Sequence, residues 1–414
     1  MFRTQCLCCG SRKLHEVINL GMHPLADSFI PVERLSEPDP VYLLACDFCA
    51  DCGQIQNRTV TSPEERYSMT DYSYTSSHSQ TSRDHWQNYA RRVGAQIGLA
   101  AGDAVVEIGS NDGFLSACFA KTGCTVLGVD ASPTMARLAE QRGVRTVNAF
   151  FNEAALAKID GLLPRPPKLI VANNVYNHAD DPMGFAKTVG TLLAPDGAFV
   201  FELPYWAVSV RELKFDMIYH EHVNWFTATY AQSIVDRAGL KVVHIEDVDY
   251  HGGSLRVFVQ HKNAATPGMA GAVKLQGHLE LEQKMRLFNP ETYEAYARRV
   301  RERRNRFLEH VYQLKNHGDA IVCVGAAAKG NTFLNYYNLD GSIIDCVTDA
   351  SPGKIGKSTP RTRIPIVPDE DLARYERVHA IITSWNLSGP LQAILLKINP
   401  RIQFLNPYHT DYDA

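Results

Sequence analysis

The chain has 414 residues, which exceeds one ordinary domain of about 100 to 200 residues, so two large domains and a small one are expected. Its formal net charge is -3, with 42 basic and 45 acidic residues, and this balance gives no basic field for nucleic acid. No stretch approaches the roughly 20 apolar residues that span a bilayer, and the segment MFRTQCLCCG lacks the apolar core of a signal peptide. Nucleic acid and membrane are therefore not expected as partners, and the cytoplasm is the expected compartment.

Changes of pattern divide the chain into three predicted domains. Residues 1–61 form a cysteine-bearing head, and residues 62–261 form an alternating α/β block. Residues 262–414 begin with a charged helical linker and end in a second α/β block. The run RRVRERRNR in the linker contains a glutamate and no aromatic residue, which indicates a solvated helix face rather than a nucleic-acid site.

Six of the ten cysteines lie within the first 52 residues, and in a reducing compartment this clustering favours a metal over disulfides. Two CxxC pairs are each followed by glycine, as in zinc knuckles whose backbone turns toward the sulfurs. Cys8 and Cys46 are rival ligands without glycine in that place, and free buried thiols are the alternative to a metal. A closed four-thiolate site leaves no open position, so the zinc is expected to be structural. The predicted ligands are Cys6, Cys9, Cys49 and Cys52.

The stretch DAVVEIGSNDGFLSACFA is typical of a strand, a glycine-rich turn and a helix. Dinucleotide sites use Gly-x-Gly-x-x-Gly to admit a pyrophosphate, which a buried acid would repel. Here Glu107 precedes a turn that keeps only Gly109 and Gly113. This pattern favours a ligand without phosphate and with a cationic amino-acid end, namely S-adenosylmethionine (SAM).

Polar residues after the following strands extend this predicted site. Asp130 ends the second strand, where it is placed to accept hydrogen bonds from ribose hydroxyls, and Asn148 follows the third. The fourth strand leads to Asn173, Asn174 and His178, at the edge where open α/β sheets bind ligands. Together these features favour a methyltransferase over a generic α/β domain. The predicted SAM-binding residues here are Glu107, Gly109, Asn111, Asp112, Asp130, Asn148, Asn173 and Asn174.

The segment MIYHEHVNWFT packs Tyr219, His220, Glu221 and His222 into four consecutive positions. An extended segment would put the two histidines on one face, as a metal site requires, but no third ligand lies nearby in sequence. A turn or helix instead places Tyr219 and His222 on the same side. Histidine, with a pKa near about 6.5, is a natural general base that Glu221 would orient or support, so the cluster is predicted to be catalytic. A buried structural histidine is the alternative.

Two further segments are candidate anion sites. HGGSLRVFV joins a two-glycine turn to a strand, and an ordinary turn is the alternative. AIVCVGAAAKGNTFLN again indicates strand, turn and helix, with Lys329 in the turn, where lysine favours phosphate. This segment is typical of a degenerate NAD site or of a surface for a nucleotide-linked substrate, and the methyl-donor fold beside it favours the second. The predicted substrate-binding residues are His251, Ser254, Arg256 and Lys329.

The paired CxxCG, LGMHPLADSF, DYSYTSSHS, VVEIGSNDGFL, YHEHVNWF, HGGSLRVF and VGAAAKGN resemble the zinc-containing sugar C-methyltransferases that act on nucleotide-linked 4-ketosugars. The resemblance covers nearly the whole chain. It implies a small zinc-binding domain, a central Rossmann-like class I SAM-dependent methyltransferase domain and a C-terminal Rossmann-like domain that helps to hold the nucleotide-sugar.

The resemblance also implies site residues. It puts the general base at His222, beside Tyr219 and Glu221 and close to His178. The tyrosine-rich segment around Tyr72 and Tyr74 is implied to cover the active site, which adds both residues to the predicted SAM site.

The implied reaction is methylation of a carbon next to the keto group of a nucleotide-linked 4-keto-deoxysugar, with C3 favoured over C5 and dTDP over GDP or CDP. A base removes a proton, and the enolate attacks the SAM methyl while Tyr219 or a protonated His178 stabilises the enolate oxygen. The alternatives are an O- or N-methyltransferase, a non-catalytic nucleotide-sugar binding protein and an NAD-dependent sugar enzyme. A monomer or small homo-oligomer is expected.

Overall fold

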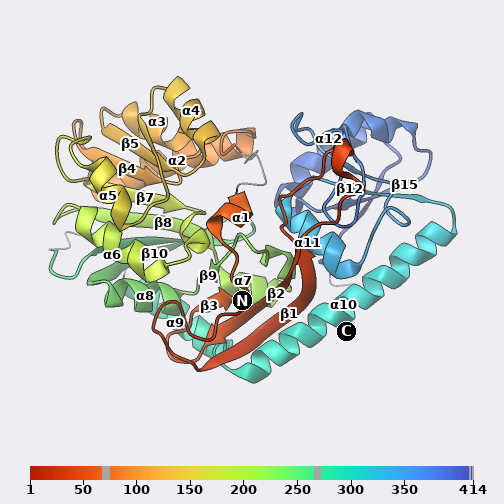
Figure 1. Cartoon of the computed structure of the whole chain (residues 1–414), viewed down its shortest axis with the longest axis horizontal. Coiled ribbons are helices and arrows are strands. Elements are labelled where there is room, and N and C mark those ends of the chain that lie inside the picture. The colour runs from red at the N-terminus through yellow and green to blue at the C-terminus, as the bar shows by residue number, and fades with distance from the viewer. Residues whose placement is uncertain (68–74, 265–271, 410–411, 413–414) are drawn as a thin grey trace.

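The computed structural model describes residues 1–67, 75–264, 272–409 and 412, which fold around three β-sheets (Figure 1). A four-stranded sheet carries the head, a seven-stranded sheet carries the central block, and a five-stranded sheet carries the C-terminal block. The α/β class is confirmed. None of the described helices is long and apolar enough to cross a membrane.

The central sheet is built around β4 (Ala104–Ile108), in the order β10-β11-β8-β7-β4-β5-β6. Its strands run parallel except β11, which is antiparallel to both of its neighbours. The residues of β4 are buried on both faces, as in parallel strands covered by helices. The other strands are β5 (Thr125–Asp130), β6 (Thr146–Asn148), β7 (Leu169–Asn173), β8 (Ala198–Pro204), β10 (Leu240–Val248) and β11 (Ser254–His261).

Helices cover both faces of this sheet. Apolar residues of α2 and α3 pack on one face, and those of α5, α6 and α8 pack on the other. Several of these helices begin at a polar side chain that accepts a hydrogen bond from the first turn, as Ser79, Ser132 and Asn152 do. The helices are α2 (Gln80–Ile97), α3 (Phe114–Ala120), α4 (Pro133–Gln141), α5 (Glu153–Ile159), α6 (Pro182–Leu192), α7 (Trp206–Glu212) and α8 (Ala228–Arg237).

The C-terminal sheet is parallel throughout, in the order β14-β13-β12-β15-β16. Helix α11 (Ala328–Tyr337) follows β12, so its first turn lies at the carboxyl edge of the sheet. The remaining elements are β12 (Ala320–Val324), β13 (Cys346–Thr348), β14 (Ile366–Val367), β15 (Val378–Ile382), β16 (Gln403–Leu405) and α12 (Ser388–Ile398).

The head joins the other two blocks rather than standing apart. Its sheet, ordered β1-β2-β3-β9, takes its last strand from the central block, directly after the Tyr219 to His222 cluster. Figure 1 shows the long β1 and β2 strands and helix α10 running between the blocks. The elements are β1 (Leu14–Pro24), β2 (Val41–Cys49), β3 (Ile55–Asn57), β9 (Asn224–Trp225), α1 (Pro63–Tyr67), α9 (Ala272–Lys284) and α10 (Pro290–Asn316).

The loop between β1 and β2 docks on the C-terminal block. Ile30 forms a bridge with Ser358, and Arg363 pairs with Asp39 at 2.5 Å. The domain boundaries stay predictions. Short 3₁₀ helices complete the fold: η1 (Val32–Arg34), η2 (Tyr176–His178), η3 (Phe215–Met217), η4 (Asp369–Arg374) and η5 (Trp385–Leu387).

The turn between β10 and β11 meets the C-terminal block at Gly252. Its φ is +80°, and an added Cβ would lie 2.2 Å from Cζ3 of Trp385. We therefore expect Gly252→Ala to destabilise the protein by more than the left-handed strain of about 1 to 2 kcal/mol, measured by urea unfolding. Gly239→Ala is the matched control, because its φ is +81° and nothing lies within 4 Å. Equal losses in the two variants would contradict the contact.

Candidate active site and metal centre

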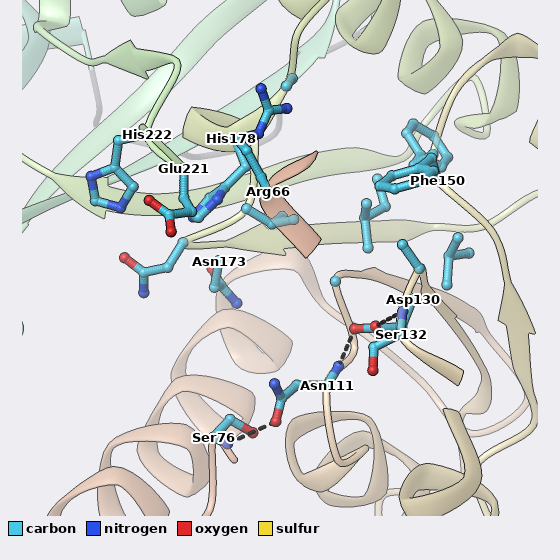
Figure 2. Close-up of a pocket in the computed structure, with 18 of the residues that line it drawn as sticks. Arg66, Ser76, Asn111, Asp130, Ser132, Phe150, Asn173, His178, Glu221 and His222 are labelled. Atoms are coloured by element: carbon cyan, nitrogen blue, oxygen red, sulfur yellow. Dashed lines mark hydrogen bonds between the residues drawn. The ribbon is translucent and has the colours of Figure 1, made fainter. Parts of the chain in front are cut away.

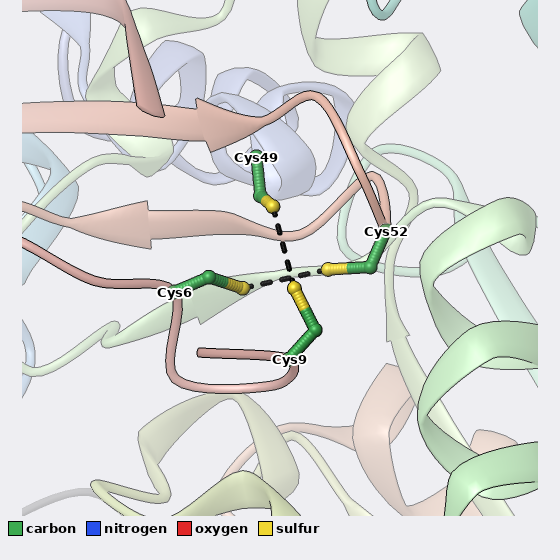
Figure 3. A group of neighbouring side chains, drawn as sticks. All are labelled: Cys6, Cys9, Cys49 and Cys52. Atoms are coloured by element: carbon green, nitrogen blue, oxygen red, sulfur yellow. Dashed lines mark hydrogen bonds between the residues drawn. The ribbon is translucent and has the colours of Figure 1, made fainter. Parts of the chain in front are cut away.

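Four cysteines of the head meet in one cluster (Figure 3). The Sγ atoms of Cys6, Cys9, Cys49 and Cys52 all lie within 4.8 Å of one another. Cys6 and Cys52 are 3.4 Å apart, and Cys9 and Cys49 are 3.6 Å apart. A tetrahedral zinc with Zn–S bonds of about 2.3 Å spaces its sulfurs by roughly 3.8 Å, so the cluster fits the ion. It is the only such group of potential ligands found among the described residues.

The two knuckles share one backbone geometry. Gly10 and Gly53 each have a φ of +74°, and each amide donates a 2.9 Å hydrogen bond to the carbonyl of the first cysteine of its pair. The left-handed glycine turns each chain back toward the sulfurs. Cys46 lies in the core of β2, where burial raises the pKa of its thiol well above its usual value, and Cys8 lies outside the cluster.

A cavity of about 1680 Å³ lies where the three blocks meet. The carboxyl edge of the central sheet lines it, together with Asp27 of the head and Lys329 of the C-terminal block. Figure 2 shows His178, Glu221 and His222 at one end of the cavity and Asp130 and its neighbours at the other. The cavity therefore brings together residues that are far apart in the sequence.

The glycine-rich turn shapes one end of the cavity. Gly109 has a φ of +67°, and an added Cβ would lie 2.7 Å from Cγ2 of Val175, so the turn requires glycine. Asp130 holds the turn, because its Oδ2 accepts a 2.8 Å hydrogen bond from the Asn111 amide. Burial raises the pKa of Glu107 to about 8, although this carboxyl also accepts hydrogen bonds from the amide and hydroxyl of Ser116.

Six of the eight SAM residues predicted between Glu107 and Asn174 line the cavity, and two do not. Asp112 accepts a 2.7 Å hydrogen bond from Ser76 and pairs with Arg142 at 3.0 Å. Asn148 is exposed and donates to the carbonyl of Asp130 at 2.9 Å. Neither residue lines the cavity, so their part in SAM binding stays a prediction. Tyr72 and Tyr74 lie outside the described residues.

Tyr219 and His222 form a hydrogen-bonded pair at the other end. The Tyr219 hydroxyl lies 2.6 Å from Nε2 of His222, and the opposite ring nitrogen, Nδ1, lies 2.9 Å from the Met217 carbonyl. A carbonyl only accepts, so Nδ1 carries the proton and Nε2 accepts from the tyrosine. Burial lowers the pKa of His222 well below its usual value, which keeps the ring neutral. The predicted turn is present, since the His222 amide donates to the Tyr219 carbonyl at 3.0 Å.

His178 and Glu221 lie near His222, but their surroundings do not favour the roles predicted for them. The His178 ring stands perpendicular to that of His222 at 5.0 Å, but burial lowers the pKa of His178 to about 3. Burial therefore disfavours a protonated His178 as the donor at neutral pH. Glu221 does not orient His222, because the Met217 carbonyl already holds Nδ1. His220 points into the head, where Nε2 lies 3.4 Å from the Leu43 carbonyl.

Of the four predicted substrate-binding residues, two line the cavity and two do not. Lys329 and His251 line the cavity, and burial lowers the pKa of the lysine to about 8 and that of the histidine to about 3. Lys329 Nζ donates to Asn386 at 2.6 Å. By contrast, Ser254 donates to the Tyr250 carbonyl at 2.9 Å.

Arg256 is also engaged inside the protein. Its Nη2 pairs with Glu202 at 2.7 Å and its Nη1 with Glu246 at 3.2 Å, and the side chain is buried in the central sheet. Ser254 and Arg256 are absent from the cavity wall, and their polar atoms are occupied by internal partners. The structure therefore does not bring Ser254 and Arg256 to the cavity, and their predicted role in substrate binding has no support from its geometry.

Sequence reasoning missed Asp27 and Arg66, which also line the cavity. Arg66 is 2% exposed and binds Asp180, 114 residues away in the chain. In the sequence Arg66 is one of several charged residues in PEERY, so only its burial in the folded protein distinguishes it from its neighbours. Asp27 lies in LADSF, within a motif of the resemblance, but no chemical pattern pointed to it.

Three family models match the chain in order: "Putative zinc binding domain" over residues 6–67, "Methyltransferase domain" over residues 80–245 and "C-methyltransferase C-terminal domain" over residues 249–399. C-methyltransferase NovU of Streptomyces niveus is 29% identical over 385 residues, which cover 92% of this chain and 90% of that protein. The chain is therefore a SAM-dependent C-methyltransferase that is similar to NovU over 92% of its length.

More distant matches cover only part of this C-methyltransferase. A ubiquinone biosynthesis O-methyltransferase of Cupriavidus pinatubonensis is 26% identical over 173 residues, 39% of this chain and 70% of that protein. The solved 1,6-didemethyltoxoflavin-N1-methyltransferase of Burkholderia thailandensis is 19% identical, with a TM-score of 0.36, and covers 51% of this chain and 97% of that one. At that score the structural likeness carries no argument.

These matches, taken with the geometry, confirm several predictions. The central block has the Rossmann-like methyltransferase fold, SAM is the methyl donor, and the head is a zinc-binding domain with its four cysteines in place. A zinc ion bound by four thiolates has no open position, so it supplies stability only.

Loss of one zinc ligand is expected to cost both metal and stability. Cys9→Ser should lose the zinc and several kcal/mol of unfolding free energy, because structural sites bind zinc with about 10 to 16 kcal/mol. Metal analysis and thermal unfolding of the purified protein measure both effects. Cys8→Ala, the adjacent thiol outside the cluster, should keep one zinc per chain. A Cys9→Ser protein with full zinc and an unchanged melting temperature would refute the assignment.

Substitution of Asp130 tests the SAM-binding end of the cavity. We propose that its carboxylate accepts hydrogen bonds from the SAM ribose, so Asp130→Ala should weaken SAM binding about 10- to 100-fold in calorimetry. The exposed Asn148 serves as the matched position, and Asn148→Ala should leave affinity nearly unchanged. Unaltered affinity in the Asp130 variant would remove this residue from the site.

Proposed function

We propose that this C-methyltransferase methylates a carbon beside the keto group of a nucleotide-linked 4-keto-deoxysugar. C3 is the favoured carbon and C5 the alternative, and dTDP is favoured over GDP or CDP. The observation that carries the proposal is the 2.6 Å contact between the Tyr219 hydroxyl and Nε2 of His222 in a cavity shared with the methyl-donor turn.

The pair supplies the step that carbon methylation requires. A ketone acidifies the hydrogens on its adjacent carbons. The unprotonated Nε2 of His222 accepts one of these hydrogens as a proton. The Met217 carbonyl supports this role, because it keeps the Nδ1 proton in place and leaves Nε2 facing the Tyr219 hydroxyl. The enolate carbon then attacks the SAM methyl, and S-adenosylhomocysteine leaves with the sulfur lone pair.

The low pKa of His222 makes it a weak base, so catalysis depends on stabilising the enolate oxygen. Each well-placed donor in such sites contributes about 2.7 to 4 kcal/mol. When substrate takes the place of the hydroxyl at Nε2, Tyr219 is free to donate to the keto oxygen. His178 and Glu221 lie near His222 at the same end of the cavity (Figure 2).

The nucleotide part of the substrate is assigned to the C-terminal block. Lys329 lies in the first turn of α11, where a lysine and the helix N-terminus both favour phosphate, and it faces the cavity. His251 lies on the same cavity wall from the β10–β11 turn. The sugar itself is inferred from the resemblance of YHEHVNWF, HGGSLRVF and VGAAAKGN to the nucleotide-sugar enzymes.

Exchange of a ring hydrogen in deuterated water tests the proposal. The enzyme with a dTDP-linked 4-ketosugar should exchange one hydrogen beside the ketone, and His222→Asn should slow both exchange and methyl transfer by about 10²- to 10⁴-fold. NMR follows exchange, and S-adenosylhomocysteine release follows transfer.

His220→Asn is the control for the same segment, because His220 faces the head, and it should retain most activity. Full activity in His222→Asn would remove His222 as the base. Methyl transfer without ring exchange in the wild type would favour an O- or N-methyltransferase, which needs a heteroatom nucleophile.

A further inference from the structure

Glu221 has no partner that explains its place in the cavity. The side chain is 6% exposed and lines the cavity, and its Oε2 atom has no hydrogen-bond partner among the described residues. It does not serve His222, whose Nδ1 is bound to the Met217 carbonyl. A buried carboxyl oxygen without a partner is costly, which indicates a group that a ligand completes.

Asp27 lies beside this carboxyl, although it belongs to the head. Its amide donates to Glu221 Oε1 at 3.4 Å, and its side chain lines the same cavity. Helix α11 holds the loop in place, because Asn331 Nδ2 donates to the Ala26 carbonyl at 2.5 Å. Two parts of the chain nearly 200 residues apart therefore present carboxyl groups to one site.

The surroundings of the two carboxyls do not favour two negative charges. Neither Asp27 nor Glu221 forms an ion pair within the described parts of the chain. Burial, and then the charge of Asp27, raises the pKa of Glu221 to about 7. Backbone hydrogen bonds, including the one from the Asp27 amide, and Arg66 oppose this shift. Burial also raises the pKa of Asp27, which Lys354 opposes and Asp349 reinforces. The two neighbouring histidines, His178 and His222, are neutral and add no positive charge.

We propose that Glu221 is protonated beside Asp27 and that it acts as an O–H donor to the keto oxygen of the substrate. Asp27 is then a positioning residue, and the catalytic use of the pair depends on the proposed function. His222 Nε2 takes the carbon-bound proton, Glu221 hydrogen-bonds the enolate oxygen without losing its proton, and the electron pair goes to the methyl carbon. A neutral carboxylic acid in an apolar site donates in this way to developing oxyanions.

The pH dependence has a defined sign. Activity requires neutral His222 and protonated Glu221, so it is lost as the pH rises through the Glu221 pKa of about 7. Asp27→Asn removes the negative charge that raises this pKa, so the alkaline limb should move to lower pH. Glu221→Gln keeps an N–H donor that does not titrate, so the limb should vanish and the rate should fall less than in Glu221→Ala. Glu221→Ala should lose about 10²- to 10³-fold in rate.

Infrared difference spectra of the full-length, zinc-loaded protein test the pair without any substrate. Wild type minus Glu221→Gln should show the carbonyl band of a protonated carboxyl at neutral pH, and in Asp27→Asn this band should titrate at lower pH. Glu33→Gln, an exposed carboxyl on the same head loop, should leave the band unchanged. Absence of the band, or the same titration in Asp27→Asn, would overturn the pair.

Methyl-transfer profiles with a dTDP-linked 4-ketosugar then test the donor role. Equal loss in Glu221→Gln and Glu221→Ala, in an enzyme that still exchanges the ring hydrogen, would overturn the donor role and leave the proposed function intact. If the wild type does not act on ketosugars but the band titrates as expected, the carboxyl pair stands and the proposed function fails.

Discussion

The pairing of β3 with β9 is the constraint on which the active site depends. Ile55 pairs with Trp225, and Gln56 with Asn224, so the head's sheet fixes the strand that directly follows His222. Gln54, between the second zinc knuckle and β3, donates from its amide to the Asn224 side chain and to the Tyr230 hydroxyl at 3.2 Å. The zinc does no chemistry, yet the segment that it stabilises holds the end of the turn from Tyr219 to His222.

Burial of the titratable side chains is the second constraint, and it sets the charge state of the cavity wall. Burial keeps His178 and His222 neutral, weakens the acidity of Glu221 and lowers the pKa of Lys329. Around His222, such surroundings suit an uncharged base and neutral donors. The charge that develops on an enolate is then stabilised by hydrogen bonds aimed at one oxygen, in surroundings where such bonds are strong.

Local sequence patterns predicted those parts of the structure that short-range interactions determine. The two CxxCG knuckles, the Gly109 turn and the spacing of Tyr219 and His222 each follow from short-range geometry, and all are present. The predicted site residues that the structure places away from the cavity depend on long-range packing. Arg256 reads as an anion-binding residue in HGGSLRVF, but the strand pairing of β11 with β8 places it opposite Glu202.

The cavity residues that sequence reasoning missed also depend on contacts between segments that are far apart in the sequence. The position of Asp27 against Glu221 depends on the docking of the head's loop on α11, and the burial of Arg66 depends on Asp180. No periodicity or motif reports such contacts, because they arise only when the three blocks are assembled. A protonated His178 was the alternative to Tyr219 as donor, and burial, which follows from the whole fold, disfavours it.

The central claim is that the methyl group is transferred to a carbon beside a ketone. NMR of the product formed from SAM with a ¹³C-labelled methyl group and a dTDP-linked 4-ketosugar tests it most directly. The account predicts a carbon-bound methyl coupled to the ring carbon adjacent to the ketone, at C3 or at C5. A methyl group bound to oxygen or nitrogen, or its absence from every ketosugar offered, would contradict the account.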